Sequence, residues 1–169
     1  MKLEIGCGNN KKEGYFGIDI HQYEGVDLVQ NVSEAPWKIE DSSCTEIYAN
    51  QVIEHIPDLR LFFSEMYRVA KDGCKIRLTT PHYSSYNSWG DPTHIHHLSV
   101  SFCKPLTQGY LSHQIPGFEV IAEKITFGSF LWTWPGRLIC ALLGNRFYEK
   151  RFAWIFPASS VVVDLTVNK

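Results

Sequence analysis

Histidine side chains follow several of the strands that the sequence predicts. His55 comes shortly after the fourth predicted strand, His82 comes directly after the fifth, and His94 lies in the run from Asp91 to His97. In a sheet of parallel strands, ligands bind beyond the carboxyl ends of the strands. Histidine titrates near neutral pH and can take a proton from an attacking hydroxyl or amine. His55, His82 and His94 are therefore candidate general bases.

Two of these histidines, His55 and His94, also have an explanation without catalysis. His55 can brace the start of the helix that follows it, and the run 91–97 can be a loop held by hydrogen bonds. The same run can also bind substrate or a metal, since zinc takes three or four ligands. The available ligands would be Asp91, His94, His96 and His97. Their order matches no metal motif with a known mechanism, so we assign no metal ligands.

A glycine turn and an acid mark a second candidate site. Gly6 and Gly8 directly follow the first predicted strand, and Asp19 lies at the end of the second. Glycine has no Cβ, so the backbone can turn tightly and approach a ligand closely. A carboxylate at the tip of the second strand can accept hydrogen bonds from both ribose hydroxyls of an adenosine. Lys11 stands where a dinucleotide fingerprint has its third glycine, which disfavours a nicotinamide dehydrogenase.

Seven short strands and two helices would have to position these residues. Apolar side chains recur at steps of three and four from Asp58 to Lys71, which predicts a helix that Gly73 stops. A second helix is expected from Lys104 to His113. The strands are expected at 2–5, 15–20, 26–29, 46–49, 75–80, 118–127 and 160–167. Buried parallel strands followed by a terminal hairpin predict a three-layer, Rossmann-like α/β sheet, mostly parallel with an antiparallel last strand.

Composition excludes several classes of protein. The chain has 169 residues, 44% of them hydrophobic, and a formal net charge of −2. Disorder and collagen-like fibres do not fit these values, and a balanced charge argues against a partner of duplex nucleic acid. No apolar run reaches the ~20 residues of a membrane span, and the charged start does not fit a signal peptide. With five scattered cysteines, a reducing cytoplasm is the expected location.

The motifs resemble those of the class I S-adenosylmethionine-dependent methyltransferases. The segment from Leu3 to Gly8 resembles their first motif, and the segment from Gly17 to Ile20 resembles their second-strand acid motif. The segment from Tyr48 to Ile56 resembles their fourth strand and the Glu-His pair after it. The resemblance runs from about residue 3 to residue 127, with 161–167 as the usual last strand.

This resemblance implies S-adenosyl-L-methionine as cofactor and S-adenosyl-L-homocysteine as product. It places Gly6, Cys7 and Gly8 beneath the methionine and ribose of the cofactor, and Asp19 against the ribose hydroxyls. The other implied cofactor-binding residues are Glu4 for the amino group, Asn31 for the adenine amine, and Asn50 and Gln51 for the methionine end.

Three features depart from the family pattern. Asn10 stands in place of a third glycine, a short segment at 9–14 replaces the usual first helix, and the sequence begins on the first strand. We therefore expect an open site, a dimer partner that covers it, or a bulky substrate.

An aromatic insert at 129–158 precedes the last strand within what we interpret as a single domain, 1–169. It could form an extra helical layer on the core, a lid that recognises substrate, or an element that rests on lipid. Its aromatic residues are Phe130, Trp132, Trp134, Phe147, Tyr148, Phe152, Trp154 and Phe156, interleaved with Arg137, Arg146, Lys150 and Arg151.

The leading hypothesis is an enzyme that transfers a methyl group to an oxygen or nitrogen atom of a small-molecule, sugar or lipid-linked acceptor. One alternative is a non-catalytic, cofactor-binding partner subunit. A further alternative is a metal-dependent hydrolase that uses His94, His96 and His97. A homodimer and a peripheral membrane contact both stay open, and the acceptor cannot be read from the sequence.

Overall fold

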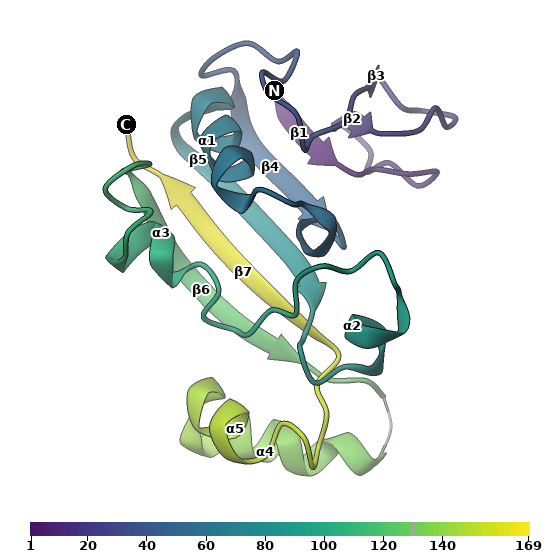
Figure 1. The fold of residues 1–169 in the computed structure, drawn as a ribbon, viewed down its shortest axis with the longest axis vertical. Helices are drawn as coiled ribbons and strands as arrows, with labels where there is room; N and C mark the ends of the chain where they lie inside the picture. Colours follow the sequence, from purple (N-terminus) through teal and green to yellow (C-terminus); the bar gives the residue numbers. More distant parts are fainter. Residues whose placement is uncertain (130) are drawn as a thin grey trace.

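The computed structural model describes residues 1–129 and 131–169 and contains one seven-stranded sheet (Figure 1). Phe130 of the aromatic insert lies outside the described residues. The strand order is β3-β2-β1-β4-β5-β7-β6; the pairs from β3 to β5 are parallel, and β7 is antiparallel to both β5 and β6. This confirms the Rossmann-like methyltransferase sheet with an antiparallel last strand. The strands are β1 (Lys2–Ile5), β2 (Phe16–Asp19), β3 (Leu28–Val29), β4 (Cys44–Asn50), β5 (Ala70–Pro81), β6 (Phe118–Thr126) and β7 (Ser160–Val167).

One face of the sheet carries the hydrophobic core. Alternate residues of β4, β5 and β7 are buried, as the period of two in a strand requires. Helices α1 (Leu59–Val69) and α3 (Lys104–Gln108) lie over this face (Figure 1). The N-terminus of α1 is capped by Asp58, whose carboxylate accepts a hydrogen bond of 3.0 Å from the backbone N–H of Leu61.

The opposite face of the same strands is polar. Glu46, Tyr48, Lys75, Arg77 and Asp164 alternate with the buried positions and point away from the core. The segment between β1 and β2, residues 9–14, contains no helix, as expected from its length. This part of the sheet therefore carries a short loop where a longer crossover would place a helix.

Both predicted helices end earlier than expected. Helix α1 stops at Val69, and β5 starts at the next residue without a loop. Gly73, which we expected to stop the helix, lies inside β5 with a φ of 73°, where the pairing of β4 with β5 shifts register. Helix α3 ends at Gln108 because the chain turns sharply at Gly109, where a Cβ would lie 2.8 Å from the Cα of Pro105. The expected extension of α3 to His113 is therefore wrong.

The aromatic insert folds into a 3₁₀ turn, η2 (Leu131–Thr133), and the helices α4 (Trp134–Leu143) and α5 (Asn145–Arg151). Its inner side belongs to the core. Tyr148 is fully buried, and its hydroxyl donates a 2.6 Å hydrogen bond to the carbonyl of Phe156. Gly136 allows α4 to approach Phe127 and Tyr148, since a Cβ there would lie 2.6 Å from the ring of Phe127.

An arginine on α1 holds the long loop between β3 and β4. The guanidinium of Arg68 donates to the carbonyls of Trp37 at 2.9 Å and Ile39 at 2.8 Å, and it pairs with Glu65 and Asp41. The buried carboxylate of Glu65 also accepts a hydrogen bond from the backbone N–H of Trp37. Burial opposes the ionisation of Glu65, but these hydrogen bonds outweigh it and lower its pKa.

We predict that Arg68→Ala lowers the free energy of unfolding by about 2 kcal/mol, because it leaves buried acceptors unpaired. The matched control is Arg60→Ala on the same helix, whose exposed pair with Asp58 spans 3.8 Å and should contribute below ~0.5 kcal/mol. Denaturant unfolding measures both. Because the pKa of Glu65 is lowered in the fold, this contribution is complete at neutral pH and is lost as the pH falls below about 4. Equal values for the two variants would contradict the prediction.

Candidate functional site

A cavity of about 400 Å³ opens at the carboxyl ends of β1, β2 and β4. Five of the residues singled out from the sequence line it: Gly6, Asp19, Asn31, Gln51 and His55. Its size falls within the usual range for ligand pockets, and its position at the strand ends is where open α/β sheets bind ligands.

The glycine turn forms one wall of this cavity. Gly6 has a φ of 67°, and its N–H donates a 2.8 Å hydrogen bond to the carbonyl of Ile18 on β2. A Cβ at Gly6 would lie 2.4 Å from Val52, so only glycine fits this close approach to the end of β4. Gly8 also has a positive φ, of 52°, but a Cβ there would meet no atom within 4 Å. The turn is therefore packed at Gly6 and faces open space at Gly8.

Asp19 joins this turn to the tip of β2. Its carboxylate accepts hydrogen bonds from the N–H of Gly8 at 2.9 Å and of His21 at 3.0 Å. An ionised carboxylate has about four acceptor positions, so two of them stay available on a side chain that lines the cavity. Asp19 is positioned both to hold the turn and to bind a diol.

Gln51 and Asn50 end β4 in different ways. Gln51 lines the cavity and has a φ of 56°, a conformation that a residue with a side chain rarely adopts. Its N–H donates to the carbonyl of Thr79 at 2.8 Å, which holds this bend in place. Asn50 is exposed and does not line the cavity.

Asn31, Glu4 and Cys7 are the three remaining residues that the sequence interpretation assigns to cofactor binding. In the structure, the side chains of Asn31 and Glu4 hydrogen bond to the protein itself, and that of Cys7 is buried. The amide of Asn31 is hydrogen bonded within its own turn, to Glu34 and to the N–H of Ser33. The carboxylate of Glu4 accepts a 2.6 Å hydrogen bond from the N–H of Lys12 and holds the segment 9–14. Cys7 is buried, and burial raises the pKa of its thiol. Neither Glu4 nor Cys7 lines the cavity.

Further residues, apolar and polar, complete the cavity and were missed from the sequence. Ile20 directly follows Asp19 and is 55% exposed, although it is a large aliphatic residue. An exposed aliphatic side chain at this place offers a flat apolar contact to a ring. The position of an isoleucine directly after a strand-tip acid can be read from the sequence and could have indicated this contact. The other lining residues that were missed are His21, Gln30, Val32, Ser33, Val52 and Ile56.

The hydrogen bonds of His55 define its tautomer. Its Nδ1 lies 3.3 Å from the carbonyl oxygen of Thr93 and 3.1 Å from the Thr93 hydroxyl, which itself donates to Asp91 at 2.6 Å. Both oxygens of Thr93 can therefore only accept from Nδ1, so Nδ1 carries the proton of the neutral ring. The Nε2 atom is left as a proton acceptor at the edge of the cavity.

His94 and Glu54 lie next to His55. The ring centroids of His55 and His94 are 4.7 Å apart, and Nδ1 of His94 faces the carbonyl of Ser88 at 3.2 Å, so its Nε2 is also an acceptor. Glu54 is fully buried on the 3₁₀ turn η1 (Ile53–His55); Oε2 accepts from Thr80, while Oε1 has no hydrogen-bond partner among the described residues. Burial raises the pKa of Glu54.

The carbonyl of Glu54 also accepts hydrogen bonds from the N–H groups of Ile95 and His96, at 2.9 and 3.2 Å. These bonds fasten the loop 91–97 to η1 and bring His94 to His55. One ligand atom each of Glu54, His55 and His94 lie within 4.8 Å of one another, so these three residues could hold a divalent cation.

The other predicted histidines lie elsewhere. Nε2 of His96 faces the carbonyl of Ile56 at 2.9 Å, and His97 stacks on Trp89 with ring centroids 3.6 Å apart. His82 is fully buried between Ser84 and Glu149 and does not line the cavity. Among the described residues, the structure thus groups His94 with Glu54 and His55 and separates it from His96 and His97.

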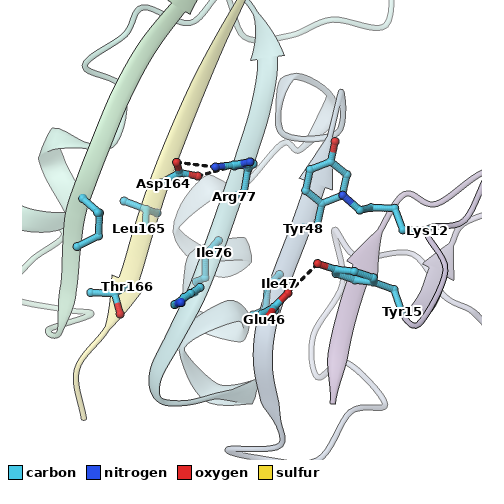
Figure 2. A pocket seen from close by; sticks show the side chains of 12 residues that line it. Lys12, Tyr15, Glu46, Ile47, Tyr48, Ile76, Arg77, Asp164, Leu165 and Thr166 are labelled. Carbon is cyan, nitrogen blue, oxygen red and sulfur yellow. Dashed lines mark hydrogen bonds and ion pairs between the residues drawn. The ribbon is translucent and has the colours of Figure 1, made fainter.

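A larger hollow, of about 580 Å³, lies over the polar face of the sheet (Figure 2). Several of its polar groups are paired with one another: Arg77 with Asp164, and the hydroxyl of Tyr15 with Glu46 at 2.8 Å. Burial and this hydrogen bond raise the pKa of Tyr15 to about 12. The hollow lies over the middle of the strands, away from the glycine turn, Asp19 and His55, so we place the candidate site in the smaller cavity.

Comparison with known proteins gives one family match and a set of solved structures. Residues 3–78, which carry the glycine turn, Asp19 and η1, match a family model described as "Methyltransferase domain". A search of curated proteins gives no match.

Solved structures share the fold over nearly the whole chain. An S-adenosylmethionine-dependent methyltransferase from Archaeoglobus fulgidus is 18% identical, with a TM-score of 0.66, over 97% of this chain and 84% of its own. A putative methyltransferase of Haloferax volcanii, solved with the activator Trm112, is 10% identical, with a TM-score of 0.59, over 98% and 80%. The [4+2]-cyclase SpnF is 14% identical, with a TM-score of 0.60, over 98% and 73%.

The chain therefore has the fold of these solved methyltransferases. The family match over 3–78, together with these structures, supports S-adenosylmethionine as the cofactor. The residues present fit this cofactor. Asp19 has free acceptor positions for the ribose diol, Ile20 offers an apolar contact to the adenine, and the space beside Gly8 is open.

We predict that Asp19→Ala weakens S-adenosylmethionine binding by about 1–3 kcal/mol, or roughly 5- to 150-fold, because a charged acceptor is lost. Calorimetric titration measures the affinity. The matched control is Asp27→Ala: Asp27 also holds backbone, accepting from the N–H of Gly17 at 2.7 Å, but does not line the cavity. The control should lose stability and keep its affinity. An unchanged affinity in Asp19→Ala would remove this residue from the site.

Proposed function

We propose that the protein transfers a methyl group from S-adenosylmethionine to an oxygen or nitrogen atom of a small-molecule, sugar or lipid-linked acceptor. The observation that supports this most directly is the position of His55. Its ring lines the same cavity as Gly6 and Asp19, and its free Nε2 lies on a residue that hydrogen bonds fix in place.

The cofactor, when bound, supplies a methyl carbon on a positively charged sulfur. This carbon would be transferred to a lone pair of the acceptor atom, with the carbon–sulfur electron pair left on sulfur and S-adenosylhomocysteine as the product. The proton of the acceptor passes to Nε2 of His55. Alignment of the two reactants supplies most of the rate enhancement, on the order of 7–11 kcal/mol, and general base catalysis adds about 10²–10⁴-fold.

The remaining residues of the cluster position this base. Thr93 holds Nδ1 of His55, and Asp91 in turn accepts from the Thr93 hydroxyl. This chain of bonds keeps the proton of the neutral ring on Nδ1, and a carboxylate at its end stabilises the imidazolium that forms. His94 packs edge-on against His55, with ring centroids 4.7 Å apart, and does not itself line the cavity. His82, which is buried against Glu149, contributes to the attachment of the insert rather than to the reaction.

The first experiment tests the cofactor and the transfer separately. Calorimetric titration with S-adenosylmethionine and S-adenosylhomocysteine should give saturable one-to-one binding at micromolar strength, with NAD as the negative control. Incubation with methyl-tritiated S-adenosylmethionine and sets of small-molecule, sugar and lipid-linked acceptors should then label one class. Binding without transfer to any acceptor would favour the non-catalytic partner subunit, and absence of binding would contradict the proposal.

We predict that His55→Ala lowers kcat by about 10²–10⁴-fold and leaves the affinity for S-adenosylmethionine within about threefold. His113→Ala, at an exposed position of a distant loop, serves as the matched control. Steady-state rates with the labelled acceptor class give kcat, and calorimetry gives the affinity. A small loss in kcat would mean that the acceptor needs no base, as expected for an already deprotonated or amine acceptor.

In a second candidate function, Glu54, His55 and His94 hold a divalent cation, and this cation binds the acceptor. The unpaired Oε1 of buried Glu54 and the Nε2 lone pairs of His55 and His94 favour it. Two imidazoles with one carboxylate suit zinc and similar transition metals. Metal–ligand bonds of ~2.1 Å allow two ligands to lie up to ~4.2 Å apart, so a separation of 4.8 Å needs only a small closure.

Elemental analysis distinguishes the two candidates. The protein is purified without a histidine tag, dialysed against zinc and then against buffer, and compared with Glu54→Gln. If His55 acts as a base without a metal, both the unchanged protein and Glu54→Gln should contain much less than one zinc per chain. About one zinc per chain, lost in Glu54→Gln, would replace the free base by a metal-bound acceptor.

A further inference from the structure

The outer side of the aromatic insert exposes many large apolar side chains. They lie on η2, along α4 and in the segment after α5, which are close together at one end of the molecule (Figure 1). Their exposed fractions are 88% for Leu131, 70% for Trp132, 59% for Trp134, 47% for Leu138, 71% for Leu142, 57% for Leu143 and 67% for Trp154. Single exposed apolar residues are ordinary, but a continuous group of this kind marks an interaction surface.

Helix α4 touches the rest of the protein on one side only. Gly136 is its one buried residue, and this side contacts Phe127 and Tyr148. Trp134, Leu138 and Leu142 recur at four-residue steps and therefore share another side of the helix. A helix that is apolar around most of its circumference is normally covered on all sides. The described part of the chain leaves the outer side of α4 uncovered.

Basic side chains border this surface. Arg146, Lys150 and Arg151 are exposed on α5, and Lys150 and Arg151 form no ion pair with any described residue. The acid between them, Glu149, turns inward and accepts hydrogen bonds from His82 at 3.1 Å and from the N–H of Val100 at 2.6 Å. From residue 131 to residue 148 the sequence has no Asp or Glu. The rim is therefore positively charged.

We propose that η2, α4, α5 and the segment around Trp154 form a docking surface for an anionic phospholipid bilayer. Tryptophan and leucine inserted at headgroup depth, with basic residues beside them, are the side chains of interfacial helices. A second copy of the chain fits this surface less well, because a two-fold contact would bring two basic rims together.

Docking would place α4 in the plane of the bilayer. With ten residues, α4 is about 15 Å long, half of the ~30 Å hydrocarbon core. None of the helices in the described residues is long and apolar enough to cross a membrane. Partial insertion of one helical side is the geometry that agrees with both observations.

The docking surface lies at the end of the sheet that holds the candidate site. Strands β4 and β5 point toward the end where α4 and α5 lie (Figure 1), and the cofactor cavity opens at the carboxyl ends of β1, β2 and β4. A bilayer against α4 would therefore lie on the acceptor side of the protein. This last step rests on the proposed methyl transfer, and it favours a lipid-linked acceptor among the three classes.

Sedimentation with vesicles tests the docking surface. The probes are vesicles of phosphatidylcholine alone and of phosphatidylcholine with one quarter phosphatidylglycerol. We expect the protein to sediment with the mixed vesicles at least tenfold more strongly than with neutral ones, and added salt should weaken this binding. The double variant Leu138→Glu with Leu142→Glu should lose binding at least tenfold. The double variant Lys150→Glu with Arg151→Glu should lose the preference for phosphatidylglycerol.

Ile121→Glu is the matched control, because Ile121 is a similarly exposed aliphatic residue, at 61%, on the polar face of the sheet. It should bind vesicles as the unchanged protein does. Thermal unfolding should show that all variants remain folded, since the substituted side chains are exposed.

Two results would overturn the docking proposal. One is vesicle binding that the apolar double variant retains. The other is no binding to either vesicle together with a dimer that the apolar double variant dissociates, which would assign the surface to a second copy. Calorimetry with S-adenosylmethionine, performed on the same samples, keeps the two proposals apart. If the protein binds S-adenosylmethionine but no vesicles, the docking proposal is contradicted and the proposed methyl transfer is not.

Discussion

The candidate site depends on how the backbone between β1 and β2 is held without a helix. Three carboxylates hold it: Asp19 accepts from the N–H of Gly8, Glu4 accepts from the N–H of Lys12, and Asp27 pairs with the ammonium group of Lys11. Hydrogen bonds from backbone N–H groups to charged acceptors are about twice as strong as neutral ones. They therefore replace much of the order that a helix would impose. One of them, Asp19, also lines the cavity, so the turn and the cofactor share a carboxylate.

Much of this architecture could be predicted from local sequence. The alternation of Ser160 to Val167 and the 3.6-residue period after Asp58 indicated a strand and a helix at nearly their observed positions. Asp19 and Gly6 were recognisable because a strand-tip acid and a positive-φ glycine need particular residue types. The end of α1 was not, because a helix that runs directly into a strand leaves no turn residue to read. The end of α3 was missed although a turn residue, Gly109, stands there. The polar face of β4 and β5 follows from the alternation of polar and apolar residues along these strands. Its exposure depends on the segment before β2, which is too short to form a helix that would cover it.

The histidine cluster shows why proximity along the chain is a poor guide to a site. His94, His96 and His97 are neighbours in the sequence, yet only His94 lies against His55, while His96 faces the carbonyl of Ile56 and His97 stacks on Trp89. The arrangement is set by the carbonyl of Glu54, which accepts from two consecutive N–H groups of the loop 91–97. Those bonds join segments about forty residues apart, so no local pattern could reveal them. Glu54 therefore organises the cluster through its backbone carbonyl.

The inner side of the insert packs on the core, and its outer side carries the proposed docking surface. Glu149 of α5 attaches the insert to the end of β5. Glu149 of α5 accepts from buried His82 at the end of β5, and the Tyr83 hydroxyl donates to the carbonyl of the same residue at 2.8 Å. These bonds fix α5 to the strand that runs beside β4, whose end carries the cavity. Because α4 packs on α5 through Gly136 and Tyr148, the exposed apolar side of α4 keeps a defined orientation toward the strand ends. A rigid attachment of this kind is what a surface needs if its docking is to position an acceptor.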